Sequence, residues 1–202
     1  GWYKSPDQLS EQIFLKEFIE DPIKNPLETP SGKIELFSKQ IDSFKYSDCV
    51  GHPKWYGDKE YLGNTKTYRL HLLSNQPKFK LHSQLDNGHV ADNEKSDGRS
   101  VIEINKFDAE ARALTENMVV KVFNHRGCCL AVVKISDKIM PGVVNIPTGA
   151  WLDPLKSSGI SCVHGNPNVL TNDVGTSKLA QGPTAHTCLV EIEQFNEKAP
   201  RI

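Results

Sequence analysis

The sequence predicts a closed or nearly closed β-barrel preceded by a mostly irregular arm. Short strand-like runs separated by turns dominate the chain after Thr67, and only one helical stretch lies among them. The residues before that point are instead rich in Pro, Gly, Asp and isolated aromatic residues. Since 202 residues suit one principal domain, we divide the chain into a connecting arm, residues 1–64, and a barrel domain, residues 65–202.

The arm is predicted to contain one N-terminal helix. Ser5 can cap it, Pro6 suits the first helical position, and Gln8 can close a capping box. Apolar residues then recur at helical spacing, at Leu9, Ile13, Phe14 and Phe18. This pattern predicts a helix of about three turns that ends near Asp21 and Pro22.

Six runs with strand composition follow. They are Tyr68 to Leu73, Val101 to Ile104, Met118 to Phe123, Cys129 to Ile135, Val143 to Ile146, and Thr187 to Ile192. Asn124-His125-Arg126-Gly127 joins the third run to the fourth as a hairpin, in which we expect Gly127 to supply a positive φ.

A helix is predicted between the second and third runs. Asn105 can cap its first turn, and Phe107, Ala111 and Leu114 give it an apolar stripe.

Composition excludes several classes of partner. The net charge is −1, so the chain lacks the basic excess that binds nucleic acid or anionic lipid. No run of 18 apolar residues occurs, so membrane insertion is not expected, and the first residues lack the pattern of a signal peptide. The five cysteines show no Cys-x-x-Cys spacing, and we expect buried thiols rather than a zinc site.

Two polar loops are the candidate site. Residues 73–86 and 163–182 both combine amides, hydroxyls and a histidine, and the second is also rich in glycine. Such groups suit a polar, ring-bearing, phosphate-containing ligand, and two such loops at one barrel end would form one cleft. For the first loop alone, a solvated loop explains the residues equally well. Trp151 could line a pocket, but a loop tryptophan is at least as often a packing anchor, so it is left out of the predicted site.

The sequence contains no motif that would carry catalysis. The P-loop, the Rossmann fingerprint, the Gly-x-Ser-x-Gly elbow and His-Glu-x-x-His are all missing from it. We therefore assign no catalytic residue and no metal ligand. The chain is predicted to bind a cofactor whose chemistry is carried out elsewhere.

Five ordered motifs, and the segment Asn25 to Glu35 before them, resemble the C-terminal part of the dimethyl sulfoxide reductase family. The motifs are Leu73-Ser74-Asn75-Gln76-Pro77, Leu81-His82-Ser83-Gln84, Val122 to Gly127, His164 to Thr171, and Gly175 to Gly182. The branch that they resemble comprises the trimethylamine-N-oxide, dimethyl sulfoxide and biotin sulfoxide reductases. The resemblance covers almost the whole chain.

The resemblance implies a six-stranded double-psi β-barrel that binds molybdopterin guanine dinucleotide, of which the complete enzymes hold two per molybdenum. The residues that it assigns to cofactor binding are Ser74, Gln76, His82, Ser83, Gln84, Asn168, Gln181, Gly182 and His186. The implied reaction is oxygen-atom transfer from an N-oxide or S-oxide. Upstream domains of the same enzyme would hold the metal ligand and the substrate pocket, so the isolated chain should be inactive.

The resemblance also implies a haem or quinol-linked electron donor. It favours a periplasmic location, with the cytoplasm as the alternative. Two alternative hypotheses assign the chain another class of function. A free-standing double-psi barrel could act as an interaction module, although amide-rich loops suit that role poorly. A pyruvoyl-type decarboxylase would need a Gly-Ser cleavage site, which this sequence lacks.

Overall fold

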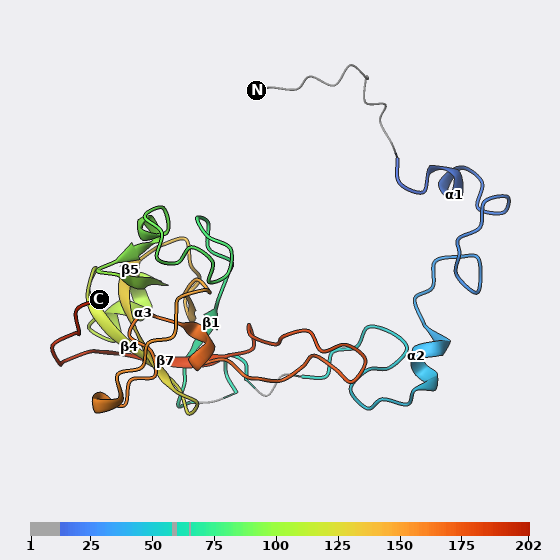
Figure 1. The fold of residues 1–202 in the computed structure, drawn as a ribbon. Coiled ribbons are helices and arrows are strands. Elements are labelled where there is room, and N and C mark those ends of the chain that lie inside the picture. The colour runs from blue at the N-terminus through green and yellow to red at the C-terminus, as the bar shows by residue number, and fades with distance from the viewer. Residues whose placement is uncertain (1–12, 58–59, 65) are drawn as a thin grey trace, which may run out of the picture. The chain divides into compact units, whose positions relative to one another are not determined.

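The computed structural model describes residues 13–57, 60–64 and 66–202, and it divides the chain into two compact units. The first unit is Gly1–Trp55 and the second is Tyr56–Ile202. Seven strands lie in the second unit, together with the third α-helix and three short 3-10 helices (Figure 1). None of the helices in the described part of the chain is long and apolar enough to cross a membrane.

The first unit is mostly irregular between two short helices. These are α1, Lys16–Glu20, and α2, Lys39–Ser43, whose first turn is capped by the Ser38 hydroxyl accepting from the Ile41 amide. The start of the predicted N-terminal helix, including Ser5, Pro6, Gln8 and Leu9, lies outside the described residues. Within them α1 ends where predicted but does not extend back to Ile13, because Leu15 adopts a left-handed backbone with φ of 57°.

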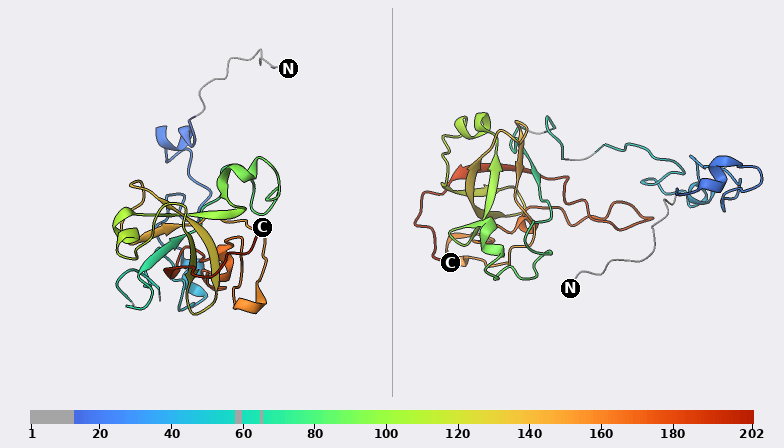
Figure 2. Two further views of the ribbon diagram at one scale, coloured as in Figure 1. Left: turned by 90° about the vertical axis from the view of Figure 1, so that its left-hand side faces the viewer. Right: turned by 90° about the horizontal axis from the view of Figure 1, so that it is seen from above.

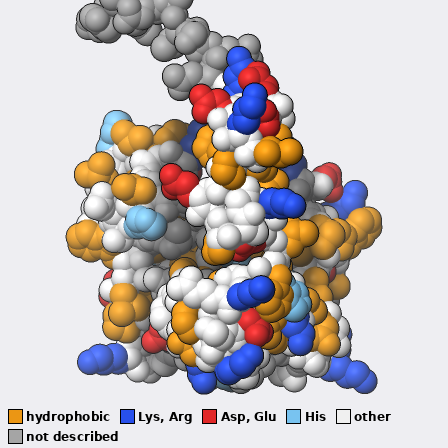
Figure 3. Space-filling model, turned by 90° about the vertical axis from the view of Figure 1, so that its right-hand side faces the viewer, with side chains coloured by type: hydrophobic (Ala, Val, Ile, Leu, Met, Phe, Trp, Pro, Cys, Tyr) orange, Lys and Arg blue, Asp and Glu red, His pale blue; other side chains and the backbone are white. Residues whose placement is uncertain are grey.

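The described residues of the first unit, 13–55, bury no hydrophobic side chain completely. Phe14, Ile23 and Leu36 are among its most exposed apolar groups. On the face of the molecule shown in Figure 3, hydrophobic side chains are spread among charged ones. The core of the structure therefore belongs to the second unit.

Six of the seven strands in the second unit close into a barrel, and the seventh, β2, pairs only with β3. The strands are β1 Leu70–Leu73, β2 Lys95–Ser96, β3 Arg99–Ile104, β4 Val119–Phe123, β5 Cys128–Ile135, β6 Val143–Asn145 and β7 Leu189–Gln194. Their order is β2-β3-β5-β4-β7-β1-β6, and β6 also pairs with β3, which closes the ring and leaves β2 outside it. Figure 2 shows the barrel from two further sides. The predicted six-stranded barrel is confirmed, and each predicted run overlaps one strand, although β3, β5 and β7 extend beyond the predicted bounds.

The pairing within the barrel mixes directions. β1 pairs with β6, and β3 with β5, in parallel, whereas the other four neighbouring pairs are antiparallel. Alternate residues of each strand point inward, which fills the barrel with aliphatic side chains such as Leu72, Ile102, Val122 and Ile192. β5 is buried on both faces because a second apolar cluster, which includes Leu130, Ile160 and Val163, covers its outer side.

The β4–β5 hairpin forms where predicted, but its glycine has another role. The Asn124 amide donates to the Gly127 carbonyl over 3.0 Å. Gly127 is not among the residues with positive φ, so the predicted reason was wrong. A Cβ there would lie 2.7 Å from the Val169 carbonyl oxygen and 2.9 Å from Ser161 Oγ. Close packing against these two residues requires a glycine.

Helix α3, Lys106–Glu110, begins at the predicted cap. The Asn105 side chain accepts from the Phe107 amide over 3.1 Å. The predicted apolar stripe was only partly right: Leu114 is buried, but Phe107 is 60% exposed and Ala111 is exposed as well. The helix has five residues and ends at the Ala111 cap. It is too short for a stripe of three positions.

We expect Gly127→Ala to lower the free energy of unfolding by about 1 to 3 kcal/mol, because the added methyl must displace two neighbouring groups. Urea denaturation of the full chain measures this. Gly182→Ala is the matched control, since its Cβ would meet only Thr176 at ordinary contact distances. Equal midpoints for the two variants would contradict the packing assigned to Gly127.

Candidate functional site

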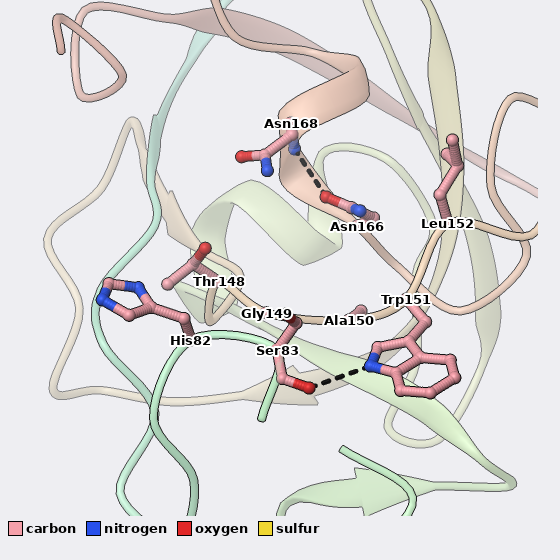
Figure 4. A pocket seen from close by; sticks show the side chains of 9 residues that line it. All are labelled: His82, Ser83, Thr148, Gly149, Ala150, Trp151, Leu152, Asn166 and Asn168. Carbon is pink, nitrogen blue, oxygen red and sulfur yellow. Dashed lines mark hydrogen bonds between the residues drawn. The ribbon is translucent and has the colours of Figure 1, made fainter. Parts of the chain in front are cut away.

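The loops after β1 and β6 leave the barrel side by side. Beyond the strand ends, the Ile146 amide donates to the Leu73 carbonyl and the Thr148 amide to the Asn75 carbonyl, both over 3.0 Å. The two loops enclose a cavity of about 440 Å³ together with the segment around η3, Pro167–Val169 (Figure 4). Its lining residues are His82, Ser83, Thr148, Gly149, Ala150, Trp151, Leu152, Asn166 and Asn168.

Gly149 sets how closely the two loops approach. A Cβ at this position would lie 1.9 Å from the His82 carbonyl oxygen, and its φ is 101°. No other residue fits both constraints. His82 itself has a φ of 50°, which marks a tight turn at the cavity edge.

The opposite wall is made by two asparagines. Asn166 caps η3, with its Oδ1 accepting from the Asn168 amide over 2.9 Å. The Asn168 side chain is exposed and makes no hydrogen bond to the residues that the structure describes. Its amide can therefore both donate to and accept from a ligand in the cavity.

Behind the first loop lies a buried carboxylate between two lysines. Asp86 forms ion pairs with Lys80 and Lys95, and all three side chains are less than a tenth exposed. Burial raises the pKa of Asp86, but the two ammonium groups outweigh burial, so the pKa is lowered overall. Asp86 therefore stays charged and ties the loop to β2.

Arg126 fixes the segment 170–189, which contains most of the second polar loop, where it meets the barrel. Its guanidinium forms a two-pronged ion pair with Glu60 and also donates to the Leu170 carbonyl and to Asn172 Oδ1. Glu60 in turn accepts from the Leu189 amide over 2.9 Å. The pair thus joins the two ends of the 170–189 segment.

The charge of Glu60 is strongly favoured by this arrangement. Burial raises its pKa, but hydrogen bonds from Arg126, Leu189 and Asn172 and the charge of Arg126 lower it to about 2. Both side chains of the pair are only 17% exposed, so solvent screens them weakly.

The nine predicted site residues fall into four places. His82, Ser83 and Asn168 line the cavity. Ser74 and His186 meet each other, with the Ser74 amide 3.5 Å from His186 Nδ1. Gln181 and Gly182 lie on a two-stranded ribbon held by the Gly175 and Pro183 bridge, and they do not line the cavity.

Gln76 and Gln84 shape the first loop and do not line the cavity. The Gln76 side chain donates to the Lys80 carbonyl over 2.9 Å, and the Gln84 amide donates to the Leu81 carbonyl. The predicted single cleft is therefore only partly present. Only His82 and Ser83 of the first polar loop and Asn166 and Asn168 of the second line the cavity.

Sequence reasoning missed Thr148, Gly149, Trp151 and Asn166 as lining residues. A signal existed in Thr148-Gly149-Ala150-Trp151, where a glycine and an aromatic residue directly follow a strand. Trp151 is left out of the predicted site because a loop tryptophan is at least as often a packing anchor as a pocket residue. Its position in the cavity wall shows that it also faces the site.

Two further cavities contain none of the predicted site residues. One, of about 450 Å³, is lined in part by Asp92, Asp97 and Lys95, and the other lies in the first unit between Ile13 and Glu28. The cavity at Asn168 differs from these two in containing predicted site residues, and it is not larger than they are.

A family model described as "Molydopterin dinucleotide binding domain" matches residues 70–189. The chain belongs to this molybdopterin dinucleotide binding family. The match contains five of the six barrel strands and only the first residue of β7, and it contains all nine predicted site residues.

Curated relatives place the domain within larger proteins. The chain is 47% identical to trimethylamine-N-oxide reductase 1 of Escherichia coli K12, with 92% of this chain and 23% of the relative covered. It is 42% identical to biotin sulfoxide reductase of Cereibacter sphaeroides, covering 91% and 24% respectively. It is 44% identical to dimethyl sulfoxide/trimethylamine N-oxide reductase of the same species, covering 89% and 22%. The chain thus spans about a quarter of the length of these relatives.

A solved structure shows the same fold. Acetylene hydratase from Pelobacter acetylenicus superposes on 87% of this chain and 25% of its own, with a TM-score of 0.67 and 19% sequence identity. At that identity the likeness concerns the fold alone.

The cavity of this molybdopterin dinucleotide binding domain fits part of such a ligand. It offers the side-chain amide of Asn168, which has no partner among the described residues, an imidazole at His82 and hydroxyls at Ser83 and Thr148. Gly149 allows the two loops that bound the cavity to approach closely. These groups match a polar heterocycle with phosphates. A volume of about 440 Å³ suits one portion of a dinucleotide.

We expect Glu60→Gln to destabilise the chain by about 2 to 3 kcal/mol at pH 7, because the native pKa lies far below the unfolded value. A lowered pKa stabilises the fold above the unfolded pKa, and this stabilisation is lost as pH falls toward about 2. The difference in free energy of unfolding between wild type and variant, measured by urea denaturation, should therefore be largest above about pH 5 and decrease at lower pH.

Glu103→Gln is the control for that measurement, because Glu103 pairs with Lys134 on the surface. Its removal should change stability by less than about 1 kcal/mol at any pH. A pH-independent gap for Glu60→Gln would contradict the role given to its charge.

Proposed function

We propose that this domain holds molybdopterin guanine dinucleotide in an enzyme that reduces N-oxides or S-oxides by oxygen-atom transfer. The observation that supports this most is the polar cavity bounded by His82, Ser83 and Asn168 in a member of the molybdopterin dinucleotide binding family. The relatives that are 42% to 47% identical are named as reductases of trimethylamine N-oxide, dimethyl sulfoxide and biotin sulfoxide.

The cavity residues would bind and orient the cofactor. Asn168 and His82 supply hydrogen bonds to its heterocycle or phosphates, and Ser83 and Thr148 complete the polar wall. When bound, the cofactor would supply the molybdenum needed for oxygen-atom transfer. This chain contributes binding, orientation and the exclusion of water.

Six more residues are proposed as contacts outside the cavity. They are Ser74, Gln76, Gln84, Gln181, Gly182 and His186. Ser74 and His186 already meet at the end of β1, and the ribbon that carries Gln181 projects from the barrel (Figure 1). A ligand longer than the cavity could touch both.

The interaction-module alternative has less support. It would call for an apolar docking patch at the loops, whereas the cavity is lined mainly by amides, hydroxyls and an imidazole. The family match and the reductase relatives favour cofactor binding over this alternative.

A role in anaerobic respiration, a periplasmic location and a haem or quinol-linked donor are also proposed. They rest on the resemblance to the oxide reductase branch alone. Osmotic-shock fractionation of cells that produce the complete enzyme tests the location. Release of the enzyme with the periplasmic fraction is the expected result, and retention in the cytoplasm would contradict it.

Asn168→Ala should raise the dissociation constant of the full chain for released molybdopterin guanine dinucleotide about tenfold, which corresponds to one or two lost hydrogen bonds. Titration under anaerobic conditions, followed by amide-resolved NMR, measures it. Asn93→Ala is the control, because Asn93 is exposed and bonds only to Val90 near η1, Ala91–Glu94. Equal effects of the two variants, or no response of the cavity amides in the wild type, would refute the proposed binding.

The reaction is tested with the complete enzyme that contains this chain. Loaded with molybdenum and supplied with a reduced viologen dye, it should reduce at least one of trimethylamine N-oxide, dimethyl sulfoxide and biotin sulfoxide. A loaded enzyme that oxidises the dye with none of the three would overturn the assignment to oxide reduction.

A further inference from the structure

Trp151 is anchored at every polar atom and still half exposed. Its amide donates to Asp86 Oδ2 over 3.3 Å, and its indole Nε1 donates to the Ser83 carbonyl over 2.9 Å. Its carbonyl accepts from the Cys162 thiol over 3.4 Å. Yet 53% of the residue is exposed, at the opposite end of the cavity from His82 (Figure 4).

Such an arrangement is unusual for a residue that only packs. A packing tryptophan buries its large apolar ring, whereas here the polar atoms are fixed and the ring remains in the cavity wall. A ring held in this way loses little conformational freedom when a ligand stacks on it.

Asp86, which accepts the hydrogen bond from the Trp151 amide, is itself fixed by two buried lysines. Asp86 Oδ1 pairs with Lys95 over 3.2 Å and with Lys80, while the Asp86 carbonyl accepts from Lys95 Nζ. Its other oxygen, Oδ2, is directed at the Trp151 amide. The two lysines thus fix the carboxylate, and the carboxylate fixes the start of the Trp151 segment.

We propose that Trp151 is an aromatic platform on which a fused 2-amino-4-oxo-pyrimidine ring of the cofactor stacks, and that Asp86 is the residue that positions this platform. The proposal rests on the proposed function. Guanine and pterin both contain this ring, which is planar and carries an amide-like edge. The side-chain amide of Asn168 lies in the same cavity without a partner among the described residues, and it can recognise that edge.

The test is a titration of the ¹⁵N-labelled full chain, followed through the backbone amides and the Trp151 indole signal. Trp151→Phe assigns that signal. Guanosine monophosphate and 6-hydroxymethylpterin are the two ring probes, and pyrophosphate is the ringless control. We expect a ring-current shift of the indole signal with at least one ring probe and none with pyrophosphate. The probe with the tighter response identifies which half of the cofactor stacks.

Variants of Trp151 and Asp86 test the stacking role and the positioning role separately. Trp151→Leu keeps an apolar side chain without a stacking ring, and should weaken ring binding about tenfold while leaving pyrophosphate binding unchanged. Asp86→Asn should weaken ring binding several-fold and speed hydrogen exchange at the Trp151 indole. Asp137→Asn is the matched control, because its pair with Lys106 is exposed and far along the chain. It should change neither quantity.

The outcomes distinguish the platform from the proposed function. If ring probes shift the amides of His82 and Asn168 but not the Trp151 indole, the platform is refuted and cofactor binding stands. If neither ring probe shifts any cavity amide at millimolar concentration, both are refuted. Should Asp86→Asn not fold, the wild-type indole response and Trp151→Leu still decide the platform. A folded Asp86→Asn with an unchanged indole signal would overturn the positioning role.

Discussion

The three residues of β6 close the barrel, and the site depends on that closure. Val143–Asn145 pair in parallel with β1 and antiparallel with β3, so that Asn145 stands between Leu73 and Glu103. Because β1 and β6 run in the same direction, the chain leaves both strands at the same end. The loop after β1 and the loop after β6 are therefore forced together, and the cavity lies between them.

Two buried ion-pair clusters then fix the loops at their roots. Glu60 and Arg126 join the ends of the 170–189 segment, and Asp86 with its two lysines ties the first loop to β2. Desolvation makes such clusters costly, so their value lies in selecting one arrangement more than in adding stability. Each cluster is placed where a polar loop would otherwise have several conformations of similar energy. The loops are thereby shaped before any cofactor arrives, which lowers the entropy cost of binding.

Local sequence patterns predicted most of the barrel. Alternating β-branched residues around Val120 and Val132 mark strands because one face must be buried, and the Asn105 cap is a local hydrogen bond. Gly127 was found as a turn residue for the wrong reason, since the constraint on it comes from Val169, some forty residues away. Contacts of that kind leave no trace in the pattern of neighbouring residues.

The site was harder to predict for the same reason. His82, Ser83 and Asn168 stand in the two polar loops that the sequence singles out, and they line the cavity. Trp151 was set aside because sequence cannot show whether a loop tryptophan is buried, and the Asp86 cluster was missed because charged residues in a loop resemble a solvated surface. The placement of Gln181 on a ribbon away from the cavity depends on how that loop folds back on itself, through the Thr176 amide and the Gly182 carbonyl.

The central claim is that the cavity between the β1 and β6 loops holds part of the cofactor. A crystal structure of the full chain grown with molybdopterin guanine dinucleotide under anaerobic conditions tests this most directly. The account predicts one heterocycle of the ligand in the cavity, within hydrogen-bond distance of Asn168 and against the Trp151 ring. Ligand density confined to the ribbon around Gln181, or to the cavity lined by Asp92 and Asp97, would contradict it.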